Sequence, residues 1–136
     1  MTEILDNGWR EQAARVVTRM QDEVYRLCHS KGWYEDERSV GDLCALLHSE
    51  VSEVLEAYRK KGFQDASKTI YGVSEDGRDR VVKGEKPEGV GSEMADILIR
   101  LLDMAKRWDV NLIAEYERKM RYNWTRPHRH GDKYRV

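Results

Sequence analysis

The hydrophobic residues of this chain recur at the spacing of amphipathic helices rather than strands. Between residues 7 and 30 the apolar positions fall on one stripe at about 100° per residue, and Gly32 follows shortly after its end. Two adjacent aromatic residues, Trp33 and Tyr34, come next in a predicted loop. The pattern therefore predicts a first helix over about residues 7–30.

A second helix is predicted up to residue 61. Ser39 and Asp42 have the three-residue spacing of a capping box at its start, and Gly62 follows its end. Residues 62–87 differ, because they hold four glycines and an Asp76-Gly77 turn between short β-prone runs at 69–71 and 80–82. We expect a hairpin-like insertion or a mobile loop there.

Two more helices are predicted beyond this insertion. Pro87 suits the first turn of a helix that continues to about Arg107, and Asp109 can cap a fourth helix over about residues 110–123. Four amphipathic helices predict a single all-α domain over residues 1–136, four-helix-bundle-like, with the insertion between its second and third helices. Because the fourth helix is short, we expect a second copy of the chain to supply part of the core.

Charge is distributed unevenly, although the net charge is only −1. Residues 118–136 carry seven basic residues and one acid, which leaves a net charge of −7 on residues 1–117. An acidic body with a basic tail at 124–136 favours an anionic partner, bridged through a cation or bound by the tail itself.

Composition excludes several classes of protein. No apolar run approaches the roughly 20 residues that a membrane span needs, so no membrane partner is expected. Two cysteines, Cys28 and Cys44, are too few for a disulfide framework or a zinc site made of cysteines. The sequence therefore predicts a reduced, cytoplasmic protein.

The second predicted helix places a carboxylate on its apolar side. Glu50 falls in the middle of the stripe formed by Leu43, Leu47 and Val54, and Glu53 lies at its edge. A glutamate that faces the core is costly unless it is paired or binds a metal ion. Some positive charge is therefore expected beside Glu50.

The third predicted helix repeats this spacing with Glu93 and Asp96. Two such pairs on facing antiparallel helices would gather four carboxylates, an arrangement that requires cations and suits Mg²⁺ or Mn²⁺. The alternative is that each pair belongs to an ordinary solvated helix face, since this spacing also arises by chance in a chain with 25 acidic residues.

These residues resemble the ExxE…ExxD signature of the MazG-like, all-α nucleoside triphosphate pyrophosphohydrolases. The signature is carried by residues 47–54 and 93–98, and the C-terminal part of the chain is similar to the Lys…Asn…Arg-Pro…His-Gly ending of many members, with Lys119, Asn123, Arg126-Pro127 and His130-Gly131. The resemblance extends from the second helix to the C-terminus, except for residues 62–87. Between Glu53 and Glu93 there are 39 residues, more than in compact members of the family. The substrate specificity of the family is therefore not carried over to this chain.

The resemblance implies Mg²⁺-dependent hydrolysis of a nucleoside or deoxynucleoside triphosphate to its monophosphate and pyrophosphate. It implies that Glu50, Glu53, Glu93 and Asp96 bind Mg²⁺ (or Mn²⁺) and that the enzyme is a homodimer or homotetramer. It also implies phosphate contacts by three residues, Lys119, Asn123 and Arg126. Glu53, at the edge of the stripe, is the candidate general base that takes the proton of the attacking water.

Several residues have two interpretations. Trp33 is a candidate for stacking on a nucleobase, whereas Tyr34 is expected to pack against the helices. Arg100 either pairs with Asp96 one turn away or contacts phosphate, and Asp103 is expected to face water. The histidines His29 and His48 and the two cysteines are interpreted as structural residues.

A second class of function stays open. The chain can instead be a non-catalytic helical oligomer whose basic tail binds nucleic acid or an acidic protein partner, with Tyr122, Trp124 and Tyr134 interleaved among the basic residues. The enzyme is favoured over nucleic-acid binding, because a tail-binding protein gives no reason to bury paired carboxylates.

Overall fold

The computed structural model describes residues 8–63, 72–73, 79–80 and 86–128, and within them the fold is all-helical apart from one short strand pair. The four helices are α1 (Gly8–Ser30), α2 (Val40–Lys61), α3 (Val90–Arg107) and α4 (Leu112–Thr125). The prediction of an all-α fold is confirmed, and the number and order of the helices agree with the hydrophobic pattern.

The predicted boundaries of α2 are confirmed. The Ser39 side chain accepts a hydrogen bond from the Asp42 backbone N–H at 3.0 Å, and the Asp42 carboxylate accepts one from the Ser39 backbone at 3.2 Å, which completes the capping box. At the other end Gly62 has φ +61°, a left-handed conformation that side chains with a Cβ rarely adopt.

The predicted starts of α3 and α4 are wrong by a few residues. Pro87 lies outside α3, whose N-cap is Gly89. The Pro87 carbonyl accepts a hydrogen bond from Ser92 Oγ at 3.1 Å. Asn111, not Asp109, caps α4, because its side chain accepts from the Ala114 backbone N–H at 3.1 Å. Asp109 has φ +53° in the turn before that cap and cannot take the extended conformation that an N-cap requires.

A short hairpin joins α2 and α3, as expected for this insertion. The strands β1 (Gly72–Val73) and β2 (Asp79–Arg80) pair antiparallel, with Gly72 opposite Arg80. The predicted turn at Asp76-Gly77 and the β-prone run at 69–71 lie outside the described residues, as do residues 81–82 of the second run.

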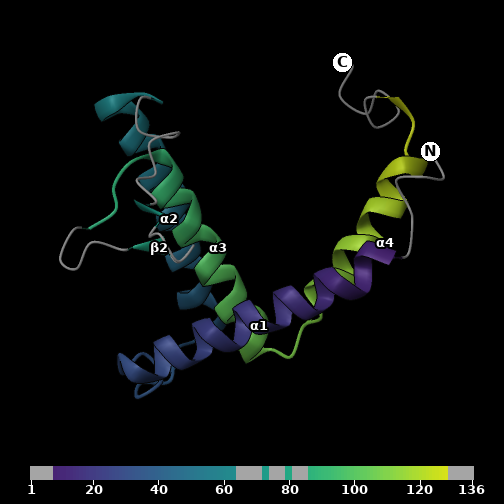
Figure 1. Cartoon of the computed structure of the whole chain (residues 1–136), viewed down its shortest axis with the longest axis horizontal. Coiled ribbons are helices and arrows are strands. Elements are labelled where there is room, and N and C mark those ends of the chain that lie inside the picture. Colours follow the sequence, from purple (N-terminus) through teal and green to yellow (C-terminus); the bar gives the residue numbers. More distant parts are fainter. Residues whose placement is uncertain (1–7, 64–71, 74–78, 81–85, 129–136) are drawn as a thin grey trace.

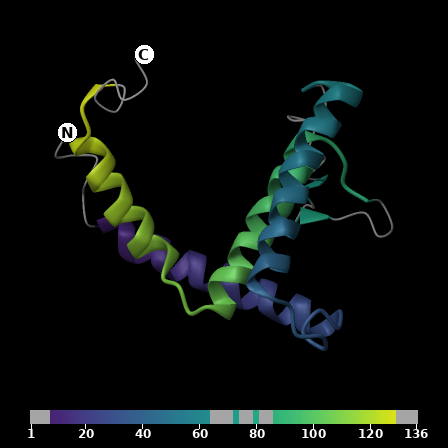
Figure 2. The same cartoon turned by 180° about the vertical axis from the view of Figure 1, so that it is seen from behind.

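The helices form two diverging arms (Figure 1, Figure 2). One arm is an antiparallel pair of α2 and α3, which make the most extensive helix–helix contact in the molecule. Helix α1 crosses the end of this pair and packs against α3, while α4 packs against the N-terminal half of α1 as the second arm. Within the described residues, one chain therefore does not close a bundle of four helices.

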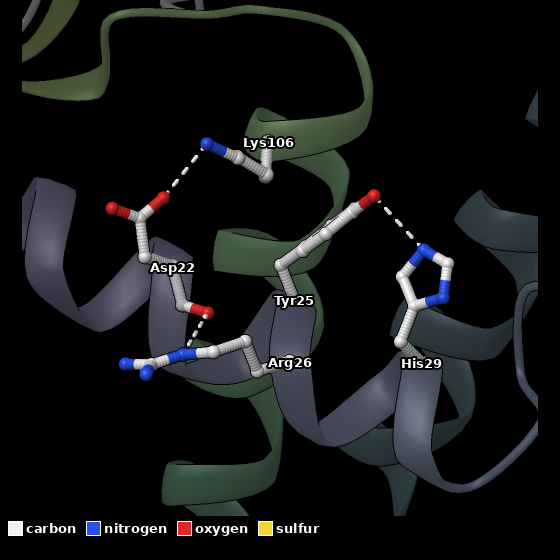
Figure 3. Close-up of polar contacts among 5 residues, drawn as sticks. All are labelled: Asp22, Tyr25, Arg26, His29 and Lys106. Atoms are coloured by element: carbon white, nitrogen blue, oxygen red, sulfur yellow. Dashed lines mark hydrogen bonds and ion pairs between the residues drawn. The ribbon is translucent and has the colours of Figure 1, made fainter.

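The core lies where α1 crosses α3. Val24, Cys28 and Leu102 are buried there, and they are surrounded by partly buried apolar side chains of α1, α3 and the start of α4. Polar contacts fix the rim of this crossing, as Figure 3 shows: Lys106 Nζ lies 2.7 Å from Asp22 Oδ1, and the Tyr25 hydroxyl lies 2.9 Å from His29 Nε2.

No helix in the described part of the chain is long and apolar enough to cross a membrane.

Candidate metal-binding carboxylate site

Three of the four predicted metal-binding carboxylates converge between α2 and α3. One oxygen each of Glu50, Glu53 and Glu93 lies within 4.8 Å of the other two. Glu50 and Glu53 stand one turn apart on α2, and Glu93 belongs to the first turn of α3. The antiparallel pairing of the two helices therefore creates the cluster from residues about 40 positions apart.

Glu50 is buried, as its position on the apolar stripe predicts, with 10% of its side chain exposed. Its partner is Arg100 of α3, whose Nε donates a hydrogen bond to Glu50 Oε1 at 2.5 Å. The expected positive charge beside Glu50 is therefore an arginine of the same chain. The interpretation of Arg100 as the ion-pair partner of Asp96 on its own helix is wrong, because Arg100 forms its ion pair with Glu50.

The pKa values of two neighbouring carboxylates, Glu53 and Asp96, are raised. A hydrogen bond with Glu50 and the negative charge of Glu50 raise the pKa of Glu53 above its ordinary value. Burial, followed by the charge of Glu50, raises the pKa of Asp96, while Arg100 acts in the opposite direction. Asp96 lies outside the three-carboxylate cluster, but the negative charge of Glu50 acts on it as well.

The donor set fits a hard divalent cation. Three carboxylates that share one small region, one of them buried, supply only oxygen ligands, which is the chemistry that Mg²⁺ and Mn²⁺ prefer. One arginine offsets only part of the negative charge gathered by Glu50, Glu53, Glu93 and Asp96.

A cavity of about 250 Å³ adjoins the cluster. Glu53 and Glu93 form part of its wall, and three lysines, Lys60, Lys61 and Lys86, form another part. The cavity also includes Gly89, where α3 begins without a side-chain cap. Basic residues thus lie beside the carboxylates, in a space that is open to solvent.

Sequence reasoning missed two of these lysines. Lys60 and Lys61 belong to a run of basic residues in the last turn of α2, where basic residues are expected simply because they favour the helix C-terminus. Lys86 lies just before α3, where a single lysine has the character of an ordinary loop charge. No pattern in the sequence signals that the end of α2 and the start of α3 share a cavity.

The predicted phosphate-binding residues of α4 are not brought to the carboxylates within one chain. Lys119, Asn123 and Arg126 are exposed and lie on or just after α4, in the arm that packs against α1 (Figure 1). Lys119 Nζ and Arg126 Cζ lie 5.7 and 5.9 Å from the ring centroid of Tyr122, so both interact with that ring.

Arg100 connects Trp33 with the carboxylate cluster, because it pairs with Glu50 and lies over the Trp33 ring. The Arg100 guanidinium carbon is 5.8 Å from the centroid of the Trp33 ring, and 40% of Trp33 remains exposed. Tyr34, in contrast, packs inward as expected, and its hydroxyl donates a hydrogen bond to Asp103 Oδ1 at 2.6 Å. The loop therefore presents one aromatic ring to solvent and anchors the other.

The expectation that Asp103 faces water is wrong. Asp103 is buried, and besides Tyr34 it accepts a hydrogen bond from Arg107 Nε at 2.8 Å. Arg107 also stacks over the Tyr34 ring, with its guanidinium carbon 3.8 Å from the centroid. Asp103 of α3 therefore holds Tyr34 in place, and with it the loop that carries Trp33.

Two of the residues interpreted as structural, Cys28 and His29, make packing or ring contacts. Cys28 is fully buried, and burial together with the charge of Asp103 raises the pKa of its thiol to about 11. His29 stacks on Tyr34, with ring centroids 4.6 Å apart. Cys44 is partly buried in α2, and His48 is exposed. His130 lies outside the described residues.

Comparison of the chain with protein-family models, with curated proteins and with solved structures finds no match.

Proposed function

We propose that the protein is a Mg²⁺-dependent nucleoside triphosphate pyrophosphohydrolase of the MazG-like type, which hydrolyses a nucleoside or deoxynucleoside triphosphate to its monophosphate and pyrophosphate. The observation that carries this proposal is the convergence of Glu50, Glu53 and Glu93, with Glu50 buried. A helix pair has no structural use for three carboxylates in contact, because their repulsion weakens the fold unless a cation joins them.

The carboxylates divide the work in this proposal. Glu50, Glu53, Glu93 and Asp96 hold Mg²⁺ (or Mn²⁺), which supplies charge neutralisation on the phosphate oxygens. Glu53 is the general base, since it is the exposed member of the cluster. Water then attacks the α-phosphorus, and pyrophosphate leaves.

The three lysines of the adjoining cavity are the nearest candidates for binding the phosphate chain. Lys60, Lys61 and Lys86 are point charges that suit phosphate oxygens, and they share the cavity with Glu53 and Glu93. Trp33 is proposed to stack on the base, because its ring is partly exposed beside Arg100. Arg100, which lies between Glu50 and the Trp33 ring, is proposed to contact phosphate.

The role proposed for Lys119, Asn123 and Arg126 depends on a second chain. Since α4 lies on the other arm, these residues reach the carboxylates only if another copy supplies them. The proposal accordingly includes a homodimer or homotetramer, and a cytoplasmic setting. For the rival function, a nucleic-acid-binding tail, residues 129–136 lie outside the described residues, and no observation on the rest of the chain favours it.

Two substitutions test the proposal. Glu50→Gln and Asp96→Asn remove one negative charge each at nearly constant volume, and we expect each to abolish release of pyrophosphate from nucleoside triphosphates in Mg²⁺ while the helical content is retained. Glu23→Gln, an exposed position of α1, is the matched control and should behave as the parent protein. Near-normal turnover in both site variants would refute the proposal.

A further inference from the structure

Helix α1 ends in a turn that holds the backbone of Trp33. The Gly32 N–H donates to the His29 carbonyl at 3.2 Å. The Trp33 N–H donates to the Cys28 carbonyl at 3.0 Å, which completes a Schellman motif around Gly32, whose φ is +74°. An apolar residue in the position of Trp33 usually packs on its own helix. Trp33 instead stays 40% exposed, with Arg100 of α3 near its ring.

Tyr34, the next residue, is held by polar and ring contacts together. Its hydroxyl donates to Asp103 Oδ1 at 2.6 Å, and the Arg107 guanidinium carbon lies 3.8 Å from its ring centroid. The His29 ring stacks on it and the Tyr25 ring meets it edge to face, with centroids 4.6 and 5.1 Å away. Burial, followed by the hydrogen bond to Asp103, raises the pKa of Tyr34, so the hydroxyl remains a donor.

Asp103 is the point at which three elements meet. Besides the Tyr34 hydroxyl, its carboxylate accepts a hydrogen bond from Arg107 Nε at 2.8 Å. The thiol of Cys28, in α1, is also hydrogen-bonded to Asp103. Arg107 reaches the loop a second time, because its Nη2 lies 3.5 Å from the Trp33 carbonyl oxygen. One buried carboxylate therefore links α1, α3 and the loop that follows α1.

Stability alone does not account for a polar network in this place. The side chains of Asp103 and Arg107 are only 11% and 14% exposed. The cost of removing an ion pair from water can exceed the attraction between its charges, so apolar residues of similar size often stabilise a fold equally well. Hydrogen bonds differ from apolar contacts in that each restricts its partners to one geometry. The network is therefore suited to fixing the position of the loop.

The loop fixed in this way carries Trp33 toward the carboxylate site. The Arg100 guanidinium carbon lies 5.8 Å from the Trp33 ring centroid, and Arg100 Nε donates to Glu50. Asp103 follows Arg100 by three residues on α3, so the residue that holds the loop and the residue near the ring share one helix. A ring that is already held in place binds a flat ligand without the cost of ordering a loop.

We propose that Asp103 is a positioning residue for the nucleobase: through Tyr34 and Arg107 it holds the Trp33 ring where a base stacks while the phosphates reach the carboxylates. Asp103 itself touches no part of the substrate. The inference rests on the proposed function, because the base belongs to the same nucleotide. It makes the site selective for nucleotides over polyphosphates without a base, since a ring held in advance stabilises only a ligand that can stack on it.

Fluorine NMR of the full chain labelled with 5-fluorotryptophan tests the positioning without any nucleotide. The chain has four tryptophans, and the resonance of Trp33 is the one that disappears in Trp33→Phe. We expect this resonance to move toward its position in the urea-unfolded chain in Asp103→Asn and in Tyr34→Phe. Asp22→Asn is the matched control, because it breaks a different polar contact between α1 and α3, the 2.7 Å pair with Lys106 (Figure 3). It should leave the Trp33 resonance in place.

Calorimetry with nucleotides that cannot be cleaved tests the role in base binding. The ligands are the α,β-methylene analogues of the common ribonucleoside and deoxyribonucleoside triphosphates, and inorganic tripolyphosphate as the ligand without a base, all with Mg²⁺. For the analogue that binds the parent protein most tightly, we expect Asp103→Asn and Trp33→Ala each to raise the Kd about 10-fold, while the Kd of tripolyphosphate changes less than about twofold. In the double variant the two effects should not add.

An unmoved Trp33 resonance in Asp103→Asn and Tyr34→Phe would overturn the proposal, and so would an equal shift in Asp22→Asn. Tyr34→Phe keeps the ring and loses only the hydroxyl, so it decides the matter if Asp103→Asn does not fold. Equal weakening of tripolyphosphate and nucleotide would show a merely structural role and would also overturn the proposal. If no analogue binds the parent protein, the proposed function fails as well. If the parent protein and Asp103→Asn bind equally tightly, only the positioning role of Asp103 fails.

Discussion

Replacing Arg100 by methionine tests the central ion pair of the site. Arg100 Nε donates to Glu50 Oε1 at 2.5 Å, and the two side chains are 27% and 10% exposed, so the pair is largely but not completely removed from water. Breaking a fully buried pair costs about 3–5 kcal/mol, and an exposed pair contributes less than about 1 kcal/mol. For this pair we expect a loss of about 2–3 kcal/mol in the free energy of unfolding.

The companion substitution Glu50→Gln should cost less, about 1 kcal/mol. The amide oxygen still accepts from Arg100, and removal of the charge relieves repulsion with Glu53. In the double variant the orphaned charge is absent, so the two effects should not add. A double-mutant cycle should therefore give a coupling of about 1.5–2 kcal/mol between positions 50 and 100.

The assay is urea unfolding followed by far-UV circular dichroism, in EDTA and at one fixed protein concentration, since association changes apparent stability. Arg118→Met is the matched control, because Arg118 forms an ion pair with Glu115 at 2.6 Å but is 79% exposed. It should cost less than about 0.5 kcal/mol. Equal effects of Arg100→Met and Arg118→Met, or a coupling near zero, would refute the reasoning.

Three further predictions concern the site, the core and the second helix. The neighbouring carboxylates raise the pKa of Glu53 above 4.5, so the folded state binds the proton more tightly and stability falls as the pH rises through the folded pKa. Metal-free Glu53→Gln should therefore be more stable than the parent protein at pH 7, by a margin that disappears below pH 4.5. In thermal unfolding scans Mg²⁺ should also remove this margin. No gain at pH 7 would contradict this. Cys28 should react with a thiol reagent only on unfolding, because it is fully buried with a pKa of about 11, whereas Cys44 should react in the folded protein; mass spectrometry of labelled peptides decides, and rapid labelling of Cys28 would count against the core as described. Ser39→Ala should lower the free energy of unfolding by about 1 kcal/mol in urea, through loss of the capping box, and an unchanged midpoint would show that the cap contributes little.

The local features of the fold were predictable from the sequence. The position of Glu50 on the buried side of α2 follows from the helical period alone, and the capping box of Ser39 and Asp42 involves residues three positions apart. The predicted cap of α4, Asp109, was wrong, because Asp109 and Asn111 are both residue types that favour the N-cap position. The choice between them depends on the backbone, which is left-handed at Asp109 and extended at Asn111.

Partners distant in the sequence were not predictable. Arg100 has an acid one turn away on its own helix, yet it pairs with Glu50, which is 50 residues away and becomes a neighbour only when α2 and α3 pack. The same holds for Asp103, whose polar character indicates solvent but whose partners, Tyr34 and Arg107, bury it. Helical period gives the face on which a side chain lies, whereas tertiary packing decides what meets it.

The two arms separate because α4 packs on α1, whereas α2 and α3 pack on each other. The fourth helix is short and has no buried residue in the single chain, and it packs on α1 through contacts such as Arg10 with Glu117. The apolar stripes indicate which residues can be buried, but not which of them the chain itself covers. Leu55 of α2 and Leu98 of α3, for example, stay half exposed.

The most direct test of the proposed function is ³¹P NMR of the purified protein with a mixed panel of nucleoside and deoxynucleoside triphosphates, in Mg²⁺ and in EDTA. We expect pyrophosphate and monophosphate to form in Mg²⁺ only, and the order of rates would name the preferred base and sugar. Formation of orthophosphate and diphosphate would contradict cleavage at the α-phosphorus. No turnover of any nucleotide by folded, Mg²⁺-loaded protein would contradict the enzyme itself and favour the binding-module alternative.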